Sequence, residues 1–160
     1  MPVLIRRAAT SDAPGMHAIA AASFSTPESI PYLLGELERR DLTRYFVCVT
    51  EAGEIIGYGG YWHVVDEGQV MNIAVQADQR GRGYGERIVR AMLDMAKGEG
   101  CATMLLEVRL SNTPALRLYE KLGFTVLSIR KDYYTEPTED AYVMECDVTA
   151  YEPLNIETKG

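Results

Sequence analysis

The stretch QRGRGYGERIVRAML, from Gln79 to Leu93, has glycines at three alternate positions directly before a segment with helical periodicity. A turn that joins a strand to a helix needs only one or two glycines. Glycine lacks a Cβ atom, so it adopts positive φ easily and lets other groups approach the main chain closely. A helix over 84–97 is indicated by five apolar residues on one face: Ile88, Val89, Met92, Leu93 and Ala96. The stretch therefore predicts a loop whose amides, together with the helix N-terminus, bind an anion.

Pyrophosphate is the anion that such a loop suits best, and Arg80 and Arg82 add positive charge. The dinucleotide pattern GxGxxG lies near the first strand and is followed about 20 residues later by an acid. Here the loop lies in the middle of the chain and Glu86 follows at once. The Gly-Lys-Ser/Thr ending of a Walker loop is also absent. The remaining alternative is a loop that is rich in glycine only because the chain must turn.

The length of 160 residues fits one domain, expected over 1–150, with a polar tail over 151–160 that should fray. No run of about 18 apolar residues occurs, so we expect no membrane contact. The first residues lack the basic-then-apolar layout of a secretory signal. These features favour a cytoplasmic protein.

The three cysteines, Cys48, Cys101 and Cys146, are odd in number and far apart. This spacing argues against a disulfide framework or a zinc site and favours buried thiols. The two histidines, His17 and His63, are too few for a metal cluster, and we expect His63 to be structural. No metal is therefore predicted.

The net charge of −7 disfavours general nucleic-acid binding by a basic surface. An acidic surface would instead attract a basic partner, such as a cationic peptide or a polyamine. The alternative is that the charge serves only solubility.

Periodicity and turn residues predict an α/β fold with elements in the order β-α-α-β-β-β-α-β-α-β-β. Thr10-Ser11-Asp12 offers N-caps for the first helix, and Ser111-Asn112 offers them for the last. The glycines at 57–60 predict a bulge or a close backbone approach. A loop is expected over 132–139. The passage from 69 to 108 needs a right-handed crossover between parallel strands, so the sheet is mixed but mostly antiparallel, with helices on its faces. The predicted strands are 3–8, 45–50, 55–65, 69–76, 102–108, 124–129 and 141–148.

The pattern Arg80-Gly81-Arg82-Gly83-Tyr84-Gly85 resembles the R/Q-x-x-G-x-G/A motif of the GNAT acyltransferases, whose loop holds the pyrophosphate of acetyl-coenzyme A. The strand at 72–75 is similar to the family strand that pairs with the pantetheine arm, and EVRLSNTPALRLYEKLGF (107–124) resembles the next family motif. The resemblance covers almost the whole chain and implies acetyl-coenzyme A as the acyl donor. The cofactor-binding residues that it implies are Ile73, Ala74, Val75, Arg80, Gly81, Arg82, Gly83, Tyr84, Gly85, Glu86 and Asn112.

Within this family the chain resembles the RimI-type N-terminal acetyltransferases, which act on the N-terminal alanine of a small-subunit ribosomal protein. The likeness rests on LEVR with SN at 106–112, on LYE at 118–120, and on RKDYY at 130–134 with EDA at 139–141. It implies a protein or peptide N-terminus as the substrate, in that group a ribosomal protein. The loop 24–29 departs from the pattern, because it lacks the Pro-Trp that many RimI-type chains carry there. That departure leaves the peptide specificity open.

Glu107 lies in the otherwise apolar strand ATMLLEV, where a carboxylate needs a reason. The resemblance implies that it is the general base, and the alternative is a strand-end carboxylate paired with Arg109 or another arginine. A free glutamate, with a pKa of about 4.3, is a weak base at pH 7, so partial burial or a relaying water would have to assist. An α-amino group, with a pKa of about 7.7–8.0, is far easier to deprotonate than lysine at about 10.4. This difference favours an N-terminal amine as the acceptor.

Tyr119 shares a helix face with Leu116 and Leu122, and by resemblance its hydroxyl protonates the departing thiolate. The alternative is a core tyrosine with an internal partner. Tyr133 and Tyr134 are expected to contact substrate, or else to be an aromatic hairpin pair. Tyr32 is expected in the opposite wall of the substrate groove. Two other functions stay open, a small-molecule N-acetyltransferase acting on polyamines or amino acids and a non-catalytic acyl-coenzyme A sensor.

Overall fold

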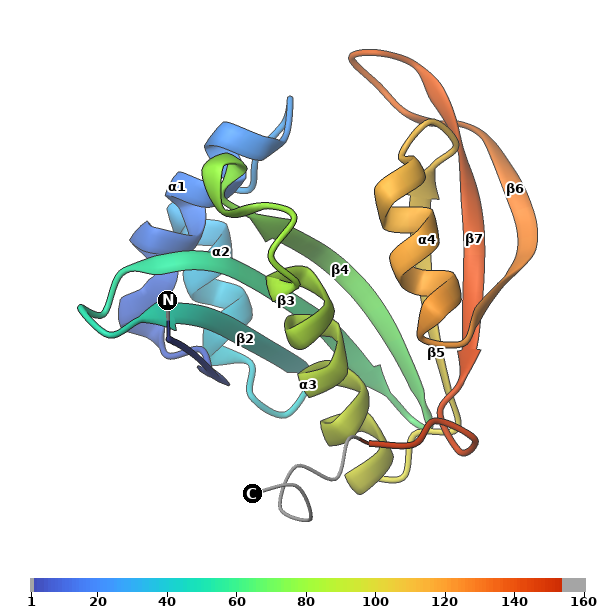
Figure 1. The fold of residues 1–160 in the computed structure, drawn as a ribbon, viewed down its shortest axis with the longest axis horizontal. Helices are drawn as coiled ribbons and strands as arrows, with labels where there is room; N and C mark the ends of the chain where they lie inside the picture. The colour runs from blue at the N-terminus through green and yellow to red at the C-terminus, as the bar shows by residue number, and fades with distance from the viewer. Residues whose placement is uncertain (1, 154–160) are drawn as a thin grey trace.

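The computed structural model describes residues 2–153. Within them the strands form one seven-stranded sheet in the order β1-β2-β3-β4-β5-β7-β6 (Figure 1). The strands are β1 (Val3–Arg7), β2 (Thr43–Thr50), β3 (Ile55–Val64), β4 (Glu67–Val75), β5 (Thr103–Arg109), β6 (Phe124–Tyr134) and β7 (Glu139–Asp147). The helices are α1 (Ala13–Ser23), α2 (Ile30–Glu38), α3 (Tyr84–Gly98) and α4 (Thr113–Lys121), with short 3-10 turns η1 (Thr10–Asp12) and η2 (Ala77–Gln79). The predicted element order and α/β class are confirmed.

The predicted parallel pair is β4 with β5, and it is short. Pairing runs only from Glu67 opposite Thr103 to Gln69 opposite Leu105. Every other pair in the sheet is antiparallel. Beyond Gln69 the two strands diverge, and the sheet opens into a wedge between the β1–β4 half and the β5–β7–β6 half (Figure 1).

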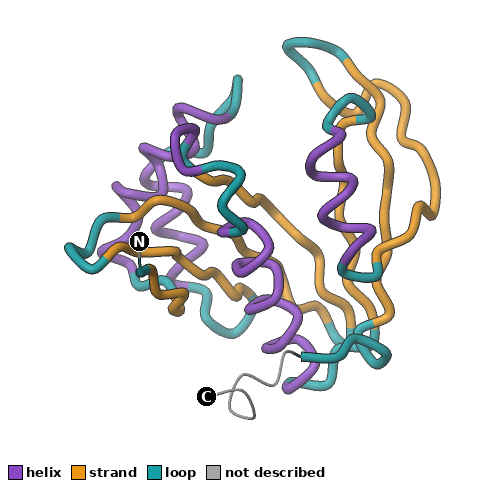
Figure 2. The backbone as a smooth tube through the Cα atoms, viewed as in Figure 1, coloured by secondary structure: helices purple, strands orange, loops and turns teal. Residues whose placement is uncertain are grey.

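Helices cover both faces of the first half of the sheet (Figure 2). The apolar face of α3 packs with Phe46, Cys48 and Ile56 in one core cluster. Helices α1 and α2 pack on the other face, where Met16 and Leu33 join Tyr45 and other buried residues. The strand residues between them are buried on both sides, which explains the long apolar runs of β2 and β3.

The glycine-rich strand β3 shows both of the predicted features. The register against β4 shifts between Gly60 and Tyr61, which is a bulge. A Cβ atom on Gly60 would lie only 2.2 Å from the ring of Tyr45, so no larger residue fits there. The close approach lets the Tyr45 ring lie over Gly60, in the core cluster that includes Leu33 and Leu37 of α2.

Asp12 corrects one sequence-based prediction. The residues 10–12 form a 3-10 turn, and no side chain among them caps α1. Instead the Asp12 carboxylate accepts hydrogen bonds from the Ala9 amide at 2.7 Å and from both terminal nitrogens of Arg6 at 2.8 and 2.9 Å. The guanidinium and the amide hold the pKa of this carboxyl below its usual value. Asp12 therefore joins the first strand to the first helix.

Two predicted boundaries are also wrong. Strand β6 runs on to Tyr134, which pairs with Glu139, so the loop covers only 135–138 and not 132–139. The prediction that the chain frays after Ala150 fails for Tyr151, whose side chain is buried in the α3 core cluster. Residues 154–160 of the predicted tail lie outside the described residues. The three cysteines are free and buried, as predicted.

No helix among residues 2–153 is long and apolar enough to cross a membrane.

Candidate active site

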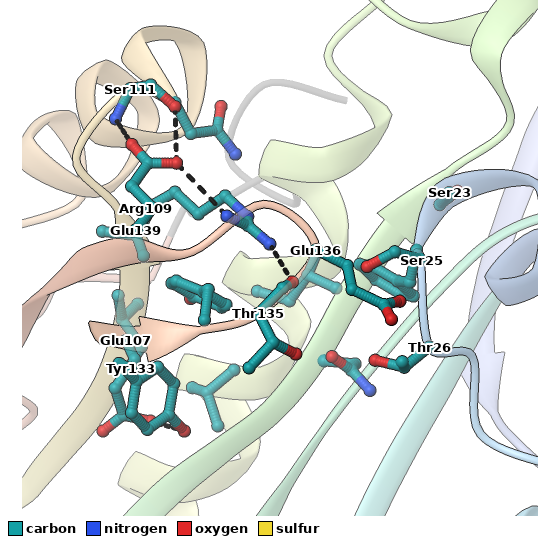
Figure 3. A pocket seen from close by; sticks show the side chains of 18 of the residues that line it. Ser23, Ser25, Thr26, Glu107, Arg109, Ser111, Tyr133, Thr135, Glu136 and Glu139 are labelled. Carbon is teal, nitrogen blue, oxygen red and sulfur yellow. Dashed lines mark hydrogen bonds and ion pairs between the residues drawn. The ribbon is translucent and has the colours of Figure 1, made fainter.

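A cavity of about 650 Å³ lies where β4 and β5 diverge (Figure 3). Its walls come from the middle of β4, from the C-terminal half of β5, from α4, from the β6–β7 hairpin and from the segment after α1. The wedge in the sheet therefore creates the cavity, and the helices and hairpin close its sides. The predicted site residues that line it are Ile73, Glu107, Asn112, Tyr119, Tyr133 and Tyr134.

Glu107 lies half-buried on β5 and faces this cavity. Its Oε1 accepts a hydrogen bond from the Tyr133 hydroxyl at 3.3 Å. The alternative partner Arg109 is engaged elsewhere, because its guanidinium pairs with Glu139 at 3.3 Å. No cation pairs with the Glu107 carboxylate within the described chain.

Tyr119 is buried on α4, where its ring packs against Phe124 with centroids 5.7 Å apart. Tyr119 belongs to the core cluster, as the alternative reading expects, but its hydroxyl has no hydrogen-bond partner within residues 2–153. Burial raises the pKa of this phenol to about 12. Tyr119 is therefore protonated at every pH near neutrality, as a proton donor must be.

The glycine loop has the geometry that an anion cradle requires. Gly81 and Gly83 have φ of 79° and 84°, a region that favours glycine. A Cβ atom built on either residue meets nothing within 4 Å, so the main chain there faces open space. Gly83 is also the N-cap residue of α3, where the amides of the first turn have no partners in the helix. Gly85 differs, because it already lies in the helix with negative φ.

Three side chains of the loop region are used within the protein. Tyr84 is buried in the core cluster beneath α3. Glu86 forms ion pairs with Arg90 at 2.9 Å and Lys121 at 2.8 Å, and these cations lower the pKa of its carboxyl. Arg80 donates to the Val75 carbonyl at 3.0 Å. For Tyr84 and Glu86, we therefore expect any contact with a cofactor to be made by the main-chain amides.

Strand β4 presents a free edge to the wedge. Since pairing with β5 ends at Gln69, the main-chain groups of Ile73, Ala74 and Val75 on that side have no strand partner within residues 2–153, although the Val75 carbonyl accepts from Arg80. An unpaired edge of this kind recruits an extended ligand through main-chain hydrogen bonds. This is the edge expected to pair with the pantetheine arm.

Asn112 combines its two predicted roles without conflict. Its Oδ1 accepts from the Ala115 amide at 3.3 Å, so it is the N-cap of α4. The residue also lines the cavity, and its amide NH₂ remains to donate to a ligand. The N-cap prediction is confirmed, and the cofactor contact stays a prediction.

Tyr133 and Tyr134 form a T-shaped pair, with ring centroids 5.0 Å apart, and both line the cavity. The aromatic hairpin pair and the position for substrate contact are therefore compatible. Tyr32 is different: it lies on α2 with 45% of its surface exposed and is not part of the lining. Its place in the opposite wall is taken by Phe24, Ser25 and Thr26.

Sequence reasoning missed the group formed by Arg109, Ser111 and Glu139 at the mouth of the cavity. Glu139 accepts from the Ser111 amide at 2.7 Å and from the Ser111 hydroxyl at 3.0 Å, as well as from Arg109 (Figure 3). These bonds lower the pKa of the Glu139 carboxyl. The available signal was the spacing, since Arg109 follows Glu107 by two residues and so lies on the same face of β5.

The matching family model is that of the acetyltransferase (GNAT) family, over residues 13–124. The chain belongs to the GNAT family. Its members are acetyltransferases that use acetyl-coenzyme A. The matched region contains the glycine loop, β4, Glu107 and Tyr119, so the predicted fold and enzyme class are confirmed.

Relatives and a solved structure agree with the predicted RimI-type likeness. The chain is 36% identical over 140 residues to a putative [ribosomal protein bS18]-alanine N-acetyltransferase of Bacillus subtilis, covering 88% of this chain and 92% of the relative. It is 37% identical over 121 residues to the [ribosomal protein bS18]-alanine N-acetyltransferase of Haemophilus influenzae, covering 73% and 82%. The crystal structure of the ribosomal-protein-S18-alanine N-acetyltransferase from Escherichia coli superposes with a TM-score of 0.85 at 29% identity, covering 94% and 97%.

Proposed function

We propose that the chain transfers an acetyl group from acetyl-coenzyme A to the N-terminal α-amine of a protein, and that its substrate is the N-terminal alanine of ribosomal protein bS18. Supporting this are the relatives of that name, which the chain matches over most of its length. The cavity supports the same proposal, since it brings a carboxylate and a buried phenol together beside a free strand edge. The protein would act in the cytoplasm, with no direct contact to nucleic acid or membrane.

The residues present fit acetyl-coenzyme A. Pyrophosphate oxygens would be held by the amides of residues 81–86, because Gly81 and Gly83 leave the main chain open there. The β4 edge at 73–75 would hold the pantetheine arm, and Asn112 would donate to it from the other side of the wedge. When bound, the cosubstrate supplies an activated acetyl thioester.

The chain's own groups would then move the protons. Glu107 would accept a proton from the α-amine, directly or through a water, which leaves the amine nucleophilic. A main-chain amide near Val75 would stabilise the developing oxyanion. Tyr119 would donate its proton to the departing thiolate, which its high pKa permits at neutral pH. Neither a metal nor a covalent enzyme intermediate is needed for this sequence of events.

The observation that carries the proposal is the pair formed by Glu107 and Tyr119, which reach one cavity from β5 and α4. The proposed roles are supported by the absence, in the described chain, of a cation paired with Glu107 and of an acceptor for the Tyr119 hydroxyl. A sensor that only binds an acyl-coenzyme A would have no use for this arrangement.

Acetyl transfer to a panel of peptides, read by mass spectrometry, tests the proposal. The panel holds the bS18 N-terminal sequence, versions with other first residues, a peptide with a blocked N-terminus and an internal lysine, and the polyamine spermidine. We expect a single acetyl group on the α-amine of the alanine-first peptide and none on the blocked peptide. Turnover of spermidine alone would indicate a small-molecule enzyme, and coenzyme A binding without any turnover would indicate a sensor.

A further inference from the structure

Arg109 makes several contacts with the β6–β7 hairpin from its position on β5. Its Nη1 donates to the Pro137 carbonyl at 2.9 Å, and its Nη2 donates to the Thr135 carbonyl at 3.2 Å. The guanidinium carbon also lies 4.3 Å from the centre of the Tyr134 ring. One side chain thus bonds to two residues of the loop 135–138 and packs on the tyrosine that precedes the loop.

The Arg109 side chain is itself held in place. Glu139, the first residue of β7, pairs with it at 3.3 Å. Two bonds from Ser111 fix that carboxylate, at 2.7 Å from the amide and 3.0 Å from the hydroxyl. Carboxylate pairing and amide donation are charge-assisted hydrogen bonds, which are shorter and stronger than neutral ones. The guanidinium is therefore bound on one side by the hairpin and on the other by a carboxylate that Ser111 holds.

The hairpin that Arg109 holds forms one wall of the cavity. Thr135 and Glu136 line it between the strand that carries Glu107 and the segment that carries Ser25 and Thr26 (Figure 3). The adjacent Tyr133 donates a hydrogen bond to Glu107, and the ring of Tyr134 packs against the ring of Tyr133 in a T-shaped pair. A displacement of the loop would therefore move the wall and the hydrogen bond to Glu107 together. The glycine loop at 81–83 is not in this lining, so it would be unaffected.

We propose that Arg109 is a positioning residue that fixes the β6–β7 loop against β5 and thereby sets the affinity for the acceptor peptide, while leaving acetyl-coenzyme A binding unchanged. The inference rests on the proposed function, because it assigns the acceptor side of the cavity to this hairpin. Lysine cannot replace arginine here, since an ammonium lacks the planar fork that donates to two carbonyls and stacks on a ring.

The test compares Arg109→Gln and Arg109→Lys with a matched control, Arg130→Gln. Arg130 lies on the same hairpin, 5.5 Å from the Tyr133 ring, and carries the same charge. We expect Arg109→Gln to raise the peptide KM about tenfold, because small displacements of positioning groups have effects of that size or larger. The KM of Arg109→Gln for acetyl-coenzyme A should stay within about twofold of the wild-type value. For Arg130→Gln, the KM for the peptide and the KM for acetyl-coenzyme A should both stay within the same limit. The peptide KM of Arg109→Lys should be close to that of Arg109→Gln.

Hydrogen exchange of the amides in 133–138 supplies a readout that does not depend on activity. We expect faster exchange there in Arg109→Gln and no change in Arg130→Gln. If Arg109→Gln fails to fold, Glu139→Gln removes the support of the guanidinium and should shift peptide KM and loop exchange in the same direction. An unchanged peptide KM with unchanged exchange would overturn the proposal, as would equal effects from Arg130→Gln. If the wild-type protein acetylates no peptide, the proposed function fails, and the exchange measurement alone decides whether Arg109 fixes the loop.

Discussion

The hydroxyl of Tyr133 donates a hydrogen bond to the carboxylate of Glu107, with 3.3 Å between Tyr133 Oη and Glu107 Oε1. The two residues are 26 positions apart and lie on different strands, so the bond exists only because β7 places the hairpin beside β5. Burial and the charge of Glu107 raise the pKa of the Tyr133 phenol, so it donates and does not ionise near neutral pH. The bond links the candidate base to the wall that would contact substrate.

Replacement of Glu107 by glutamine should lower kcat by about 10²-fold or more, because the amide cannot accept the proton of the amine. The control is Glu145→Gln. Glu145 lies opposite Leu105 on β7 and so shares the sheet face of Glu107, but it is not in the cavity lining. Steady-state kinetics at saturating acetyl-coenzyme A over pH 6–9 would measure both. If Glu107→Gln and Glu145→Gln have the same kcat, Glu107 is not the general base.

Tyr119→Phe should lower kcat without changing the shape of the pH profile below about pH 10. Because burial raises the Tyr119 pKa to about 12, the hydroxyl stays protonated throughout that range and contributes no titration to it. The same shift has a consequence for stability. A raised pKa in the folded state means that stability is complete below the unfolded value of about 10 and is lost as the pH rises towards 12.

The Tyr119 prediction is checked by two measurements. Kinetics of both enzymes between pH 6 and 10 should give parallel profiles, and alkaline unfolding of Tyr119→Phe should show a smaller loss of stability above pH 10 than the wild type. If kcat of the wild type falls at high pH and this fall is absent in Tyr119→Phe, the phenol of Tyr119 ionises between pH 6 and 10, which would contradict the prediction.

Gly83→Ala should weaken coenzyme A binding, and Gly53→Ala is its matched control. Both glycines have positive φ, 84° and 87°, and neither has an atom within 4 Å of a built Cβ. Each substitution therefore brings a similar strain of about 1–2 kcal/mol, since alanine resists the left-handed region. Only Gly83 lies in the loop proposed to hold pyrophosphate, whereas Gly53 lies in the turn between β2 and β3. Calorimetry should show a raised Kd for coenzyme A in Gly83→Ala and not in Gly53→Ala. Equal Kd values for the two variants would contradict the proposal that the glycine loop binds the pyrophosphate.

Much of this molecule follows from local sequence patterns. The 3.6-residue periodicity after Gly85 predicts α3, and the Ser111-Asn112 cap predicts the start of α4. The need for a crossover predicts that β4 and β5 are parallel. These features depend on neighbours in the sequence, so they can be derived without the fold. The roles of Glu107 and Tyr119 came from family resemblance, and the structure adds that they line one cavity.

What the sequence does not reveal depends on long-range contacts. The partners of Arg109 lie 26 to 30 residues further on, so no local pattern distinguishes a pair with Glu107 from one with Glu139. Tyr32 was expected in the opposite wall, where the cavity is lined instead by Phe24, Ser25 and Thr26, because the path of the chain after α1 cannot be read from composition. Thr10-Ser11-Asp12 was expected to cap α1 because it is a capping sequence, but the carboxylate of Asp12, which does occupy the N-cap position, binds Arg6 on the preceding strand instead.

Asp12→Asn should destabilise the fold by about 2 kcal/mol, because it removes a charge-assisted pair with Arg6 and weakens the bond from the Ala9 amide. The lowered pKa of Asp12 also sets a pH dependence. A depressed pKa in the folded state gives stability that is complete above the unfolded value of about 3.9 and is lost as the pH falls through the folded value. Urea unfolding at pH 7 and pH 3 should therefore show a difference in the free energy of unfolding between wild type and Asp12→Asn that is smaller at the lower pH.

Asp41→Asn is the control, because Asp41 is exposed and its replacement should change stability by less than about 0.5 kcal/mol. A difference between wild type and Asp12→Asn that is the same at both pH values would mean that the charge of Asp12 does not stabilise the fold.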